Sequence, residues 1–446
     1  MIVVPAFTVM LSSCDRSNSE NATSNNSLKS NSLLCEQCNL LLLNIELLRA
    51  DYIGLLNPDK LSNTPNIDRF FKNSIQFNNV SAPAGETYRS NLATLTSKEA
   101  FNFPVSEKRI HKYIKRKKNI PTPEELIDIE QMLLRFPTLT EHLKSNKYHT
   151  ISMNQGIRAG KRLMLDRGFD IVINWDRRKA SYRQTIDLLL DNLKSIKKTP
   201  YFLLYRPEVL HPMPYYYPDH LDRIQDPRRI INQHKPELSR FNIRVNHSIS
   251  KPEIRLTLHE IYAQQVRMAD QELNVIFKYL KANNQLANTI VVLYANHGSG
   301  LGDNGVEKLA VSYQSSIHVP LLILHPAVKH KIQIKTPVTL LDLMPTLMEL
   351  TGHPVPAQVD GISLLLDFNK TQDTTRPIVG RNDFDEYIRL GDYKLIRNQG
   401  NRVELYLLTT DPGEIKDIAD NDPERTRKML GLLDSIKLDI LKDHLH

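Results

Sequence analysis

The sequence predicts an α/β protein with a doubly wound, mostly parallel sheet and a small antiparallel α+β subdomain at its C-terminus. Apolar runs typical of buried strands alternate with amphipathic helices along most of the chain. After about residue 370 the sequence changes to short strands separated by turns, and one helix follows near residues 422–443. We therefore expect a leader and linker over 1–38, a main domain over 39–370 and a C-terminal subdomain over 371–446.

The predicted sheet is built from apolar runs. They read NLLLLNIE from residue 39, TPYFLLYRP at 199–207, NTIVVLYANHG at 288–298 and VPLLILHP at 319–326. Such continuous runs are typical of strands that are buried on both faces. A doubly wound sheet binds ligands beyond the carboxyl ends of its strands. The candidate site residues that lie at or just past such ends are Glu46, His211, Asn296 and His297.

Predicted helices separate these runs. TPNIDRFFKNS, with Thr64 as its N-cap, and FPTLTEHLKSNK have helical patterns, and YHTISMN reads as the strand after the second of them. A long amphipathic helix is predicted over 256–284, between two of the apolar strands. The alternation of strands and helices is what favours a parallel sheet.

The chain is basic. It has 58 lysine and arginine residues against 50 aspartate and glutamate residues, a net charge of +8 and a pI of about 9.1. This balance favours anionic partners. The densest basic run, HKYIKRKKN at 111–119, lies in no known nucleic-acid-binding motif, so we expect no nucleic-acid partner. No run of about eighteen uncharged apolar residues is present to span a membrane.

The N-terminus has features of a membrane tether. MIVVPAFTVMLSSC is apolar and then small, and LSSC resembles the lipobox of bacterial lipoproteins, although the basic start of a signal peptide is missing. The Ser/Asn-rich segment 15–32 reads as a flexible linker. We therefore predict a protein of the bacterial periplasm or cell envelope that is anchored to the membrane by a lipid on Cys14. The alternative is a frayed apolar N-terminus.

The other two cysteines lie in the segment CEQC. Cys35 and Cys38 could close a small disulfide in an oxidising compartment. A single C-x-x-C pair makes a poor zinc site. A thioredoxin-like role is not expected, because an apolar strand follows the pair at once where that motif needs a helix.

A hydroxyl stands at the start of a predicted helix in SAPAGETYRSNLATLTS, residues 81–97. Thr87 is either a plain N-cap or a nucleophile that a helix dipole and a metal ion activate. Glu46 ends an apolar strand, so it is either paired in a salt bridge, for example with Arg49, or a metal ligand.

Oxygen and nitrogen ligands from several strand ends are supplied by Glu46, Thr87 and the pair Asn296 and His297. Metal-assisted transfer of an anionic group needs such a set, together with a hydroxyl that can reach the ion. We predict one divalent ion, which is zinc, manganese, magnesium or calcium. Its predicted ligands are Glu46, Thr87, Asn296 and His297.

Several segments of the chain form an ordered set. NLLLLNIELLRADYIG is followed by TPNIDRFFKNSIQFNNVSAPAGETYRSNLATLTS, NTIVVLYANHGSGLGDNG, YQSSIHVPLLILHP, TPVTLLDLMPTLMELTG and DYKLIRNQGNRVELYLLTTDPGE. This set resembles the sulfatase family of the alkaline phosphatase superfamily over roughly residues 39–420. The resemblance implies an alkaline phosphatase-like fold, a sulfatase-like catalytic domain over 39–370, a divalent metal ion and an anionic ester substrate such as an envelope lipid or glycan.

Thr87 departs from the family pattern. It occupies the place of the cysteine that sulfatases convert to formylglycine in Cys-x-Pro-Ser-Arg, and TYRSN keeps only Ser90 of that motif. The resemblance then points to members with a threonine nucleophile, the phosphoethanolamine and glycerol-phosphate transferases, which also carry Glu at the position of Glu46. It implies phosphoryl-group transfer through Thr87. The alternatives are a sulfate-ester hydrolase with an atypical nucleophile and a non-catalytic sulfatase-like binding protein.

The resemblance implies roles for further residues. Ser90 and Lys308 would contact the substrate, and Lys308 lies close to the position of a lysine that binds the anion in the family. His211, in LYRPEVLHPMPYYYP, would bind the transferred group or protonate the leaving oxygen, with a surface-loop histidine as the alternative. His318 stands where many sulfatases carry Arg, as a further catalytic candidate. Asn296 replaces a usual Asp, which lowers the expected metal affinity.

Overall fold

The computed structural model describes residues 33–105, 130–155, 165–175, 181–196, 199–210, 252–305, 311–365 and 376–442. The predicted lipid anchor at Cys14, the linker over 15–32 and the candidates His211 and Lys308 lie outside these residues. Among the described helices, none has both the length and the apolar character needed to cross a membrane.

The main sheet confirms the predicted doubly wound, mostly parallel architecture. Eight strands follow the order β4-β3-β5-β1-β6-β7-β2-β8, and β9 pairs with β2. Pairing is parallel from β4 to β6, whereas β7 runs antiparallel to both β6 and β2. The strands are β1 (Asn39–Asn44), β2 (Ile75–Ser81), β3 (His149–Gln155), β4 (Ile171–Trp175), β5 (Tyr201–Arg206), β6 (Thr289–Tyr294), β7 (His318–Leu324), β8 (Ile332–Ile334) and β9 (Val338–Thr339).

The three central strands are buried along their whole length. Every residue of β5, β1 and β6 is buried, as expected for strands covered by helices on both faces. The register pairs Leu43 of β1 with Tyr205 of β5, and Asn44 of β1 with Tyr294 of β6. The carboxyl ends of the three strands therefore lie side by side, and the residues that follow them emerge at one edge of the sheet.

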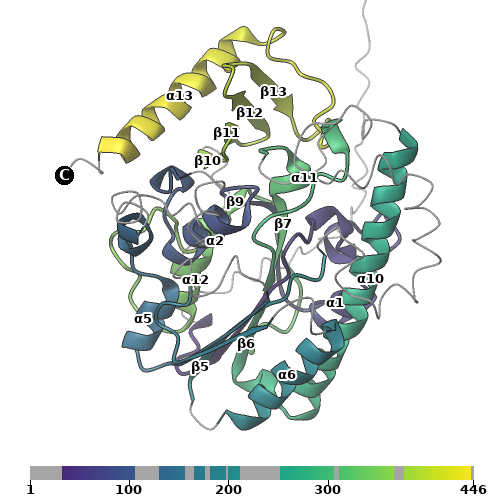
Figure 1. The fold of residues 1–446 in the computed structure, drawn as a ribbon, viewed down its shortest axis with the longest axis vertical. Coiled ribbons are helices and arrows are strands. Elements are labelled where there is room, and N and C mark those ends of the chain that lie inside the picture. Colours follow the sequence, from purple (N-terminus) through teal and green to yellow (C-terminus); the bar gives the residue numbers. More distant parts are fainter. Residues whose placement is uncertain are drawn as a thin grey trace, which may run out of the picture.

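Helices cover both faces of this sheet (Figure 1). On one face α10 (Pro252–Ala282) packs against α1 (Pro65–Phe70) and α6 (Tyr182–Ser195), and on the other α2 (Thr87–Thr96) packs against α5 (Leu139–Ser145) and α12 (Leu343–Leu350). Stacked rings of Phe70 and Phe277, 4.0 Å apart, join α1 to α10. The shorter elements are η2 (Ala50–Tyr52), η3 (Gly54–Leu56), η4 (Ala100–Asn102), η9 (Gln285–Ala287), η10 (Asp303–Gly305), η11 (Leu340–Asp342) and α11 (Gln314–Ile317).

Thr64 differs from its expected role in one respect. It stands at the N-cap position of α1, but its hydroxyl makes no capping bond. The hydroxyl accepts from the Gly54 amide and donates to Asp68 instead. Asp270 of α10 takes over the cap, because its carboxylate accepts hydrogen bonds from the Asn66 and Ile67 amides at the helix start.

A separate antiparallel sheet forms the C-terminal part, as predicted. Its strands β10 (Ile378–Arg381), β11 (Asp385–Leu390), β12 (Tyr393–Asn398) and β13 (Val403–Leu407) pair in sequence order, and α13 (Pro423–Lys442) packs on them (Figure 1). Hydrogen bonds connect this sheet to the segment before α2, among them one from the Arg381 amide of β10 to the Pro83 carbonyl at 3.0 Å. The Asn382 side chain accepts from the Gly85 amide at 2.6 Å, and the Tyr387 hydroxyl donates to the Ala82 carbonyl at 2.8 Å.

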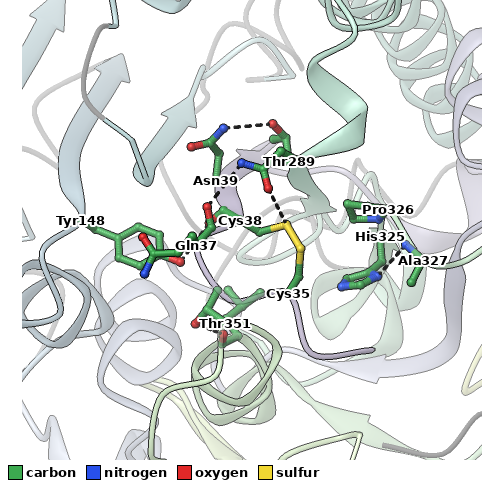
Figure 2. Close-up of a disulfide and its surroundings, with 12 residues drawn as sticks. Cys35, Gln37, Cys38, Asn39, Tyr148, Thr289, His325, Pro326, Ala327 and Thr351 are labelled. Atoms are coloured by element: carbon green, nitrogen blue, oxygen red, sulfur yellow. Dashed lines mark hydrogen bonds between the residues drawn. A yellow bond between two sulfur atoms is a disulfide. The ribbon is translucent and has the colours of Figure 1, made fainter. Parts of the chain in front are cut away.

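Cys35 and Cys38 form a disulfide just before β1 (Figure 2). The Cys35 amide donates to the carbonyl of Leu350 at the end of α12, and the Tyr148 hydroxyl donates to the Cys38 carbonyl at 2.9 Å. The disulfide therefore belongs to a turn that is fixed to the main domain on two sides.

Candidate active site

Thr87 is the first residue of α2 and is almost fully buried, with 3% of its surface exposed. The residue at the N-cap position is Glu86, so the prediction of Thr87 as a plain N-cap is wrong. Gly85 fits this turn because a Cβ there would lie only 2.7 Å from the Val311 carbonyl oxygen. The turn thus places a hydroxyl at the positive end of a helix dipole.

Two side chains from the ends of β1 and β6 meet the Thr87 hydroxyl. Thr87 Oγ1 lies 2.8 Å from Glu46 Oε1 and 3.1 Å from His297 Nε2. Nδ1 of His297 donates to the Gly298 carbonyl at 2.9 Å, so this nitrogen carries a proton. Glu46 Oε1 accepts the hydroxyl proton of Thr87, and in the neutral imidazole Nε2 is a second acceptor beside the same hydroxyl.

Glu46 has a salt-bridge partner, and that partner is Arg206. Arg206 Nη1 donates to Glu46 Oε2 at 2.5 Å, and both side chains are at most 1% exposed. The suggested pairing with Arg49 is wrong, because Arg49 binds Asp51 at 2.8 Å and Asp303 at 2.7 Å. The strand order explains the difference: β5, which ends at Arg206, is the direct neighbour of β1.

The Arg49 ion pairs fix the two loops that carry the site. Asp51 follows β1, and Asp303 lies in the loop after β6, so Arg49 joins the loops of Glu46 and His297. Burial alone would raise the pKa of Asp303. The hydrogen bond from His259 and the charge of Arg49 outweigh burial and hold that pKa below its usual value. Asp303 therefore stays ionised at neutral pH and keeps both loops together.

Asn296 is fully buried, and its side chain has no hydrogen-bond partner among the described residues, at either amide atom. Its backbone is held firmly, since its amide donates to Asn44 Oδ1 at 3.2 Å and its carbonyl accepts from Ser90 Oγ at 2.5 Å. Ser90 therefore ties α2 to the β6 loop. A buried amide without a hydrogen bond is costly, and the side chain of Asn296 carries this cost in the described part of the structure.

The chemistry of three neighbouring donor atoms suits a divalent ion. Glu46 Oε1, Thr87 Oγ1 and His297 Nε2 form a triangle with sides of 2.8, 3.1 and 4.0 Å. A carboxylate oxygen, a hydroxyl oxygen and an imidazole nitrogen are kinds of ligand that zinc and harder divalent ions bind. No group of three or more His, Cys, Asp or Glu side chains suited to a metal occurs in the described part of the chain. An ion here would therefore need the hydroxyl of Thr87, and the amide of Asn296 is the candidate fourth ligand.

His318 lies at the start of β7 and faces another partner. Its Nε2 atom lies 2.8 Å from the Asn78 carbonyl oxygen, and burial lowers the pKa of the imidazole. Within the described residues His318 makes no hydrogen bond to Thr87. The structure thus brings Glu46, Thr87 and His297 together and leaves His318 outside this cluster.

Sequence reasoning missed Arg206 and the ion pairs around Arg89. Arg89 pairs with Glu86 and with Asp383 of the C-terminal part, the latter at 3.0 Å, and all three lie next to the start of α2. Arg206 carried a usable signal, since it is a charged residue at the end of a buried apolar strand, as Glu46 is. Arg89 carried a local signal for its pairing with Glu86, three residues earlier, but none for its pairing with Asp383, which lies 294 positions away in the sequence.

The family model for sulfatases matches residues 38–353, which is well over half of the chain. The chain belongs to the sulfatase family. A second family model, described as N-sulphoglucosamine sulphohydrolase, C-terminal, matches residues 302–436 of this sulfatase-family chain. The two matches cover the main sheet with its site and the C-terminal antiparallel sheet.

Curated relatives of this sulfatase-family chain match part of it. Delta 4,5-hexuronate-2-O-sulfatase of Bacteroides thetaiotaomicron is 33% identical over 189 residues, which are 38% of this chain and 38% of that protein. Arylsulfatase K of Canis lupus familiaris is 27% identical over 204 residues, 42% of this chain and 38% of that protein. The chain thus spans well under half the length of these relatives.

Solved structures match over nearly the whole chain. The phosphonate monoester hydrolase of Agrobacterium radiobacter has a TM-score of 0.68 and 16% identity, over 91% of this chain and 96% of that one. A protein solved in complex with its substrate D-glucosamine-2-N,6-O-disulfate has a TM-score of 0.67 and 16% identity, over 91% and 98% of the chains. These likenesses confirm the predicted alkaline phosphatase-like fold.

Proposed function

We propose that this chain hydrolyses an anionic ester, in the first place a phosphate ester, with Thr87 as its nucleophile. The observation that carries the proposal is the position of the Thr87 hydroxyl, between Glu46 Oε1 and His297 Nε2 and at the N-terminus of α2. A nucleophile next to an oriented base is the arrangement that covalent catalysis needs. Membership of the sulfatase family supports an ester hydrolase.

In the proposed reaction Thr87 Oγ attacks the phosphorus atom in line with the leaving oxygen. A bond forms between Oγ and phosphorus while the bond from phosphorus to the ester oxygen breaks, and the hydroxyl proton passes to Glu46 or His297. The dipole of α2 favours the negative charge of the bound group. The proton held by Glu46 or His297 goes to the leaving ester oxygen, so that the alcohol leaves neutral. Water then attacks phosphorus, the bond from Oγ to phosphorus breaks, phosphate is released, and the proton that water gives up returns to Thr87 through Glu46 or His297. A divalent ion bound at this site would lower the pKa of the hydroxyl and offset charge on the ester oxygens.

The side chain of Thr87 suits hydrolysis of a phosphate or phosphonate ester better than it suits the reaction that sulfatases carry out with formylglycine. The β-carbon of Thr87 holds one hydroxyl, so its ester must be cleaved by attack at phosphorus or sulfur. The same chemistry would also serve transfer of the phosphoryl group from Thr87 to a hydroxyl of the cell envelope in place of water. The phosphonate monoester hydrolase among the structural neighbours makes phosphonate esters part of the first substrate panel.

A non-catalytic binding protein is the second candidate, and two observations favour it. Arg206 holds one oxygen of Glu46. Asn91 takes the position after Ser90, where the sulfatase motif has Arg, and its amide donates back to the Thr87 carbonyl at 2.8 Å and accepts from Asn44 at 3.1 Å. The side chain of Asn91 therefore forms its hydrogen bonds inside the fold instead of binding the anion from this position.

Turnover of a small panel of esters separates the two candidates. Purified protein is assayed with zinc, manganese, magnesium or calcium on an aryl phosphate monoester, a phosphodiester, a phosphonate monoester and an aryl sulfate. We expect turnover of a phosphorus ester that falls by about a thousandfold or more in Thr87→Val. Thr94→Val is the matched control, because Thr94 lies on the same helix, is buried and has an unpaired hydroxyl. No turnover with any ion and any ester would favour the binding protein.

We also propose that a lipid on Cys14 anchors the protein to the bacterial envelope and that its substrate is an envelope lipid or glycan. The proposal rests on LSSC and the Ser/Asn-rich segment after it. Palmitate labelling in cells should mark the wild type and be lost in Cys14→Ala. Equal labelling of both proteins would refute the anchor.

A further inference from the structure

The carboxyl ends of three neighbouring strands surround Arg206. The residue ends β5, whose neighbours in the sheet are β3 and β1. Its guanidinium donates to Glu46 Oε2 at 2.5 Å and to the Gln155 carbonyl at 3.1 Å, and lies 3.9 Å from the Glu208 carboxylate. Its side chain is 1% exposed. Arg206 is therefore a fixed positive charge directly behind the carboxylate that contacts Thr87.

Glu46 divides its two oxygens between Thr87 and Arg206. Oε1 accepts from the Thr87 hydroxyl, and Oε2 accepts from the guanidinium. A guanidinium is a planar cation with several N–H donors. The second amino group of Arg206 donates to the Gln155 carbonyl, which fixes the guanidinium and with it the oxygen of Glu46 that it holds. As a result Oε1 stays directed at Thr87 whether or not an ion is bound.

A divalent ion would have to share Glu46 with this guanidinium. The ion and Arg206 would lie on opposite oxygens of one buried carboxylate, and two cations at such separation repel each other more strongly than they would in water. The nearby Glu208 carboxylate offsets part of the charge of Arg206. The chain therefore places its own cation on the carboxylate that an ion at this site would also bind.

We propose that Arg206 is a positioning residue that holds Glu46 on Thr87 and competes with a divalent ion for the charge of Glu46. Such a site binds its ion weakly and keeps the Thr87–Glu46 bond when the ion leaves. The inference rests on the Thr87 site of the proposed function. Its readout is ion binding without any ester, so failure of the proposed hydrolase activity would leave it intact.

The test measures the binding of zinc and of manganese ions to the full chain by isothermal titration calorimetry. Arg206→Gln removes the guanidinium charge from Glu46 Oε2. We expect it to bind the ions about tenfold to a hundredfold more tightly than wild type, the range over which neighbours of metal ligands tune affinity. Arg206→Lys keeps the charge, so its affinity should stay within about threefold of wild type.

Arg376→Gln is the matched control. Arg376 binds both oxygens of Asp342, at 2.8 and 3.0 Å, and Asp342 is as fully buried as Glu46. The variant therefore loses an ion pair to a buried carboxylate elsewhere in the main domain, and its ion affinity should equal that of wild type.

The inference is overturned if Arg206→Gln binds the ions only as tightly as wild type, or more weakly, in a chain that circular dichroism shows to be folded. The absence of measurable ion binding in every variant also overturns it. Refolding in excess zinc covers the case of an Arg206→Gln chain that is unfolded without ions. If Arg206→Gln recovers its folded state in zinc, the result supports the competition. If it stays unfolded in zinc while Arg206→Lys is folded, the role of Arg206 is purely structural and the inference is overturned.

Discussion

Gly298 packs so closely against the Ser315 carbonyl that no side chain can be added there. A Cβ on Gly298 would also lie 3.2 Å from Arg49 Cγ. The backbone amide of Gly298 donates to the Ser316 carbonyl at 2.7 Å, so the segment cannot move aside easily. Because Gly298 follows His297 directly, this contact sets the position of the imidazole beside Thr87.

We predict that Gly298→Ala lowers the free energy of unfolding by about 2 kcal/mol, since added atoms in a tightly packed site force backbone shifts. The same variant should lose most of its ion binding, because His297 moves with the backbone. Gly431→Ala is the control: nothing lies within 4 Å of an added Cβ there, and alanine favours the helix interior. Urea unfolding measures both variants, and an undisturbed Gly298→Ala would contradict this packing argument.

Glu99 makes the stability depend on pH. Burial and the charge of Asp360 raise the pKa of its carboxyl from 4.5 to about 8, and its buried Oε2 atom has no hydrogen-bond partner among the residues that the structure describes. A raised pKa means that the folded state binds the proton more tightly than the unfolded state. The contribution of Glu99 to stability is therefore complete below about pH 4.5 and is lost as pH rises through about 8.

Glu99→Gln should remove this loss, because the amide stays neutral at every pH. We expect wild type and variant to have similar stability near pH 5, and the variant to be about 4 kcal/mol more stable at pH 8.5, since the pKa rises from 4.5 to about 8 and one pKa unit corresponds to about 1.4 kcal/mol. Denaturant unfolding at both pH values measures the difference. A stability difference that does not change with pH would show that Glu99 is ionised in the folded state throughout.

Lys394 and Glu414 form a buried ion pair between the C-terminal sheet and the loop after β13. Their side chains are at most 1% exposed and lie 2.5 Å apart, and Glu414 also accepts from the Gln314 amide of α11 at 2.6 Å. Lys394→Met leaves an unpaired buried carboxylate, so we expect a loss of about 3–5 kcal/mol in stability.

The double variant Lys394→Met with Glu414→Gln should recover part of that loss, because no charge is then left buried without a partner. Arg183→Ala, which breaks the exposed pair with Asp187, should cost about 0.5 kcal/mol or less. Thermal unfolding compares the variants. A double variant less stable than Lys394→Met by itself would show that the charge of Glu414 is not the source of the loss.

Much of the fold could be predicted because the central strands are buried on both faces. Continuous apolar sequence therefore marked β1, β5 and β6, and with them the strand ends that carry Glu46, Asn296 and His297. β4 was not predicted, because its five residues are exposed or only partly buried and its apolar run, Ile171 to Ile173, is only three residues long.

Partners across the sheet could not be predicted from the sequence. The pairing of Glu46 with Arg206 depends on β5 lying beside β1, although 160 positions separate the two residues. A nearer arginine, Arg49, was the obvious partner by sequence distance, but it belongs to the ion pairs of Asp51 and Asp303. His318 was assigned by its place in a motif, and its ring turned out to bind the Asn78 carbonyl.

In the proposed reaction Thr87 forms a covalent bond to the group that it takes from the ester. The most direct measurement is mass spectrometry of the peptide that contains Thr87, after rapid acid quenching of the enzyme with a phosphorus ester that it turns over. We predict a phosphoryl group on Thr87 in wild type and in Thr94→Val, and none in Thr87→Val. Turnover of the ester without any modified Thr87 peptide, or undiminished turnover by Thr87→Val, would contradict the account.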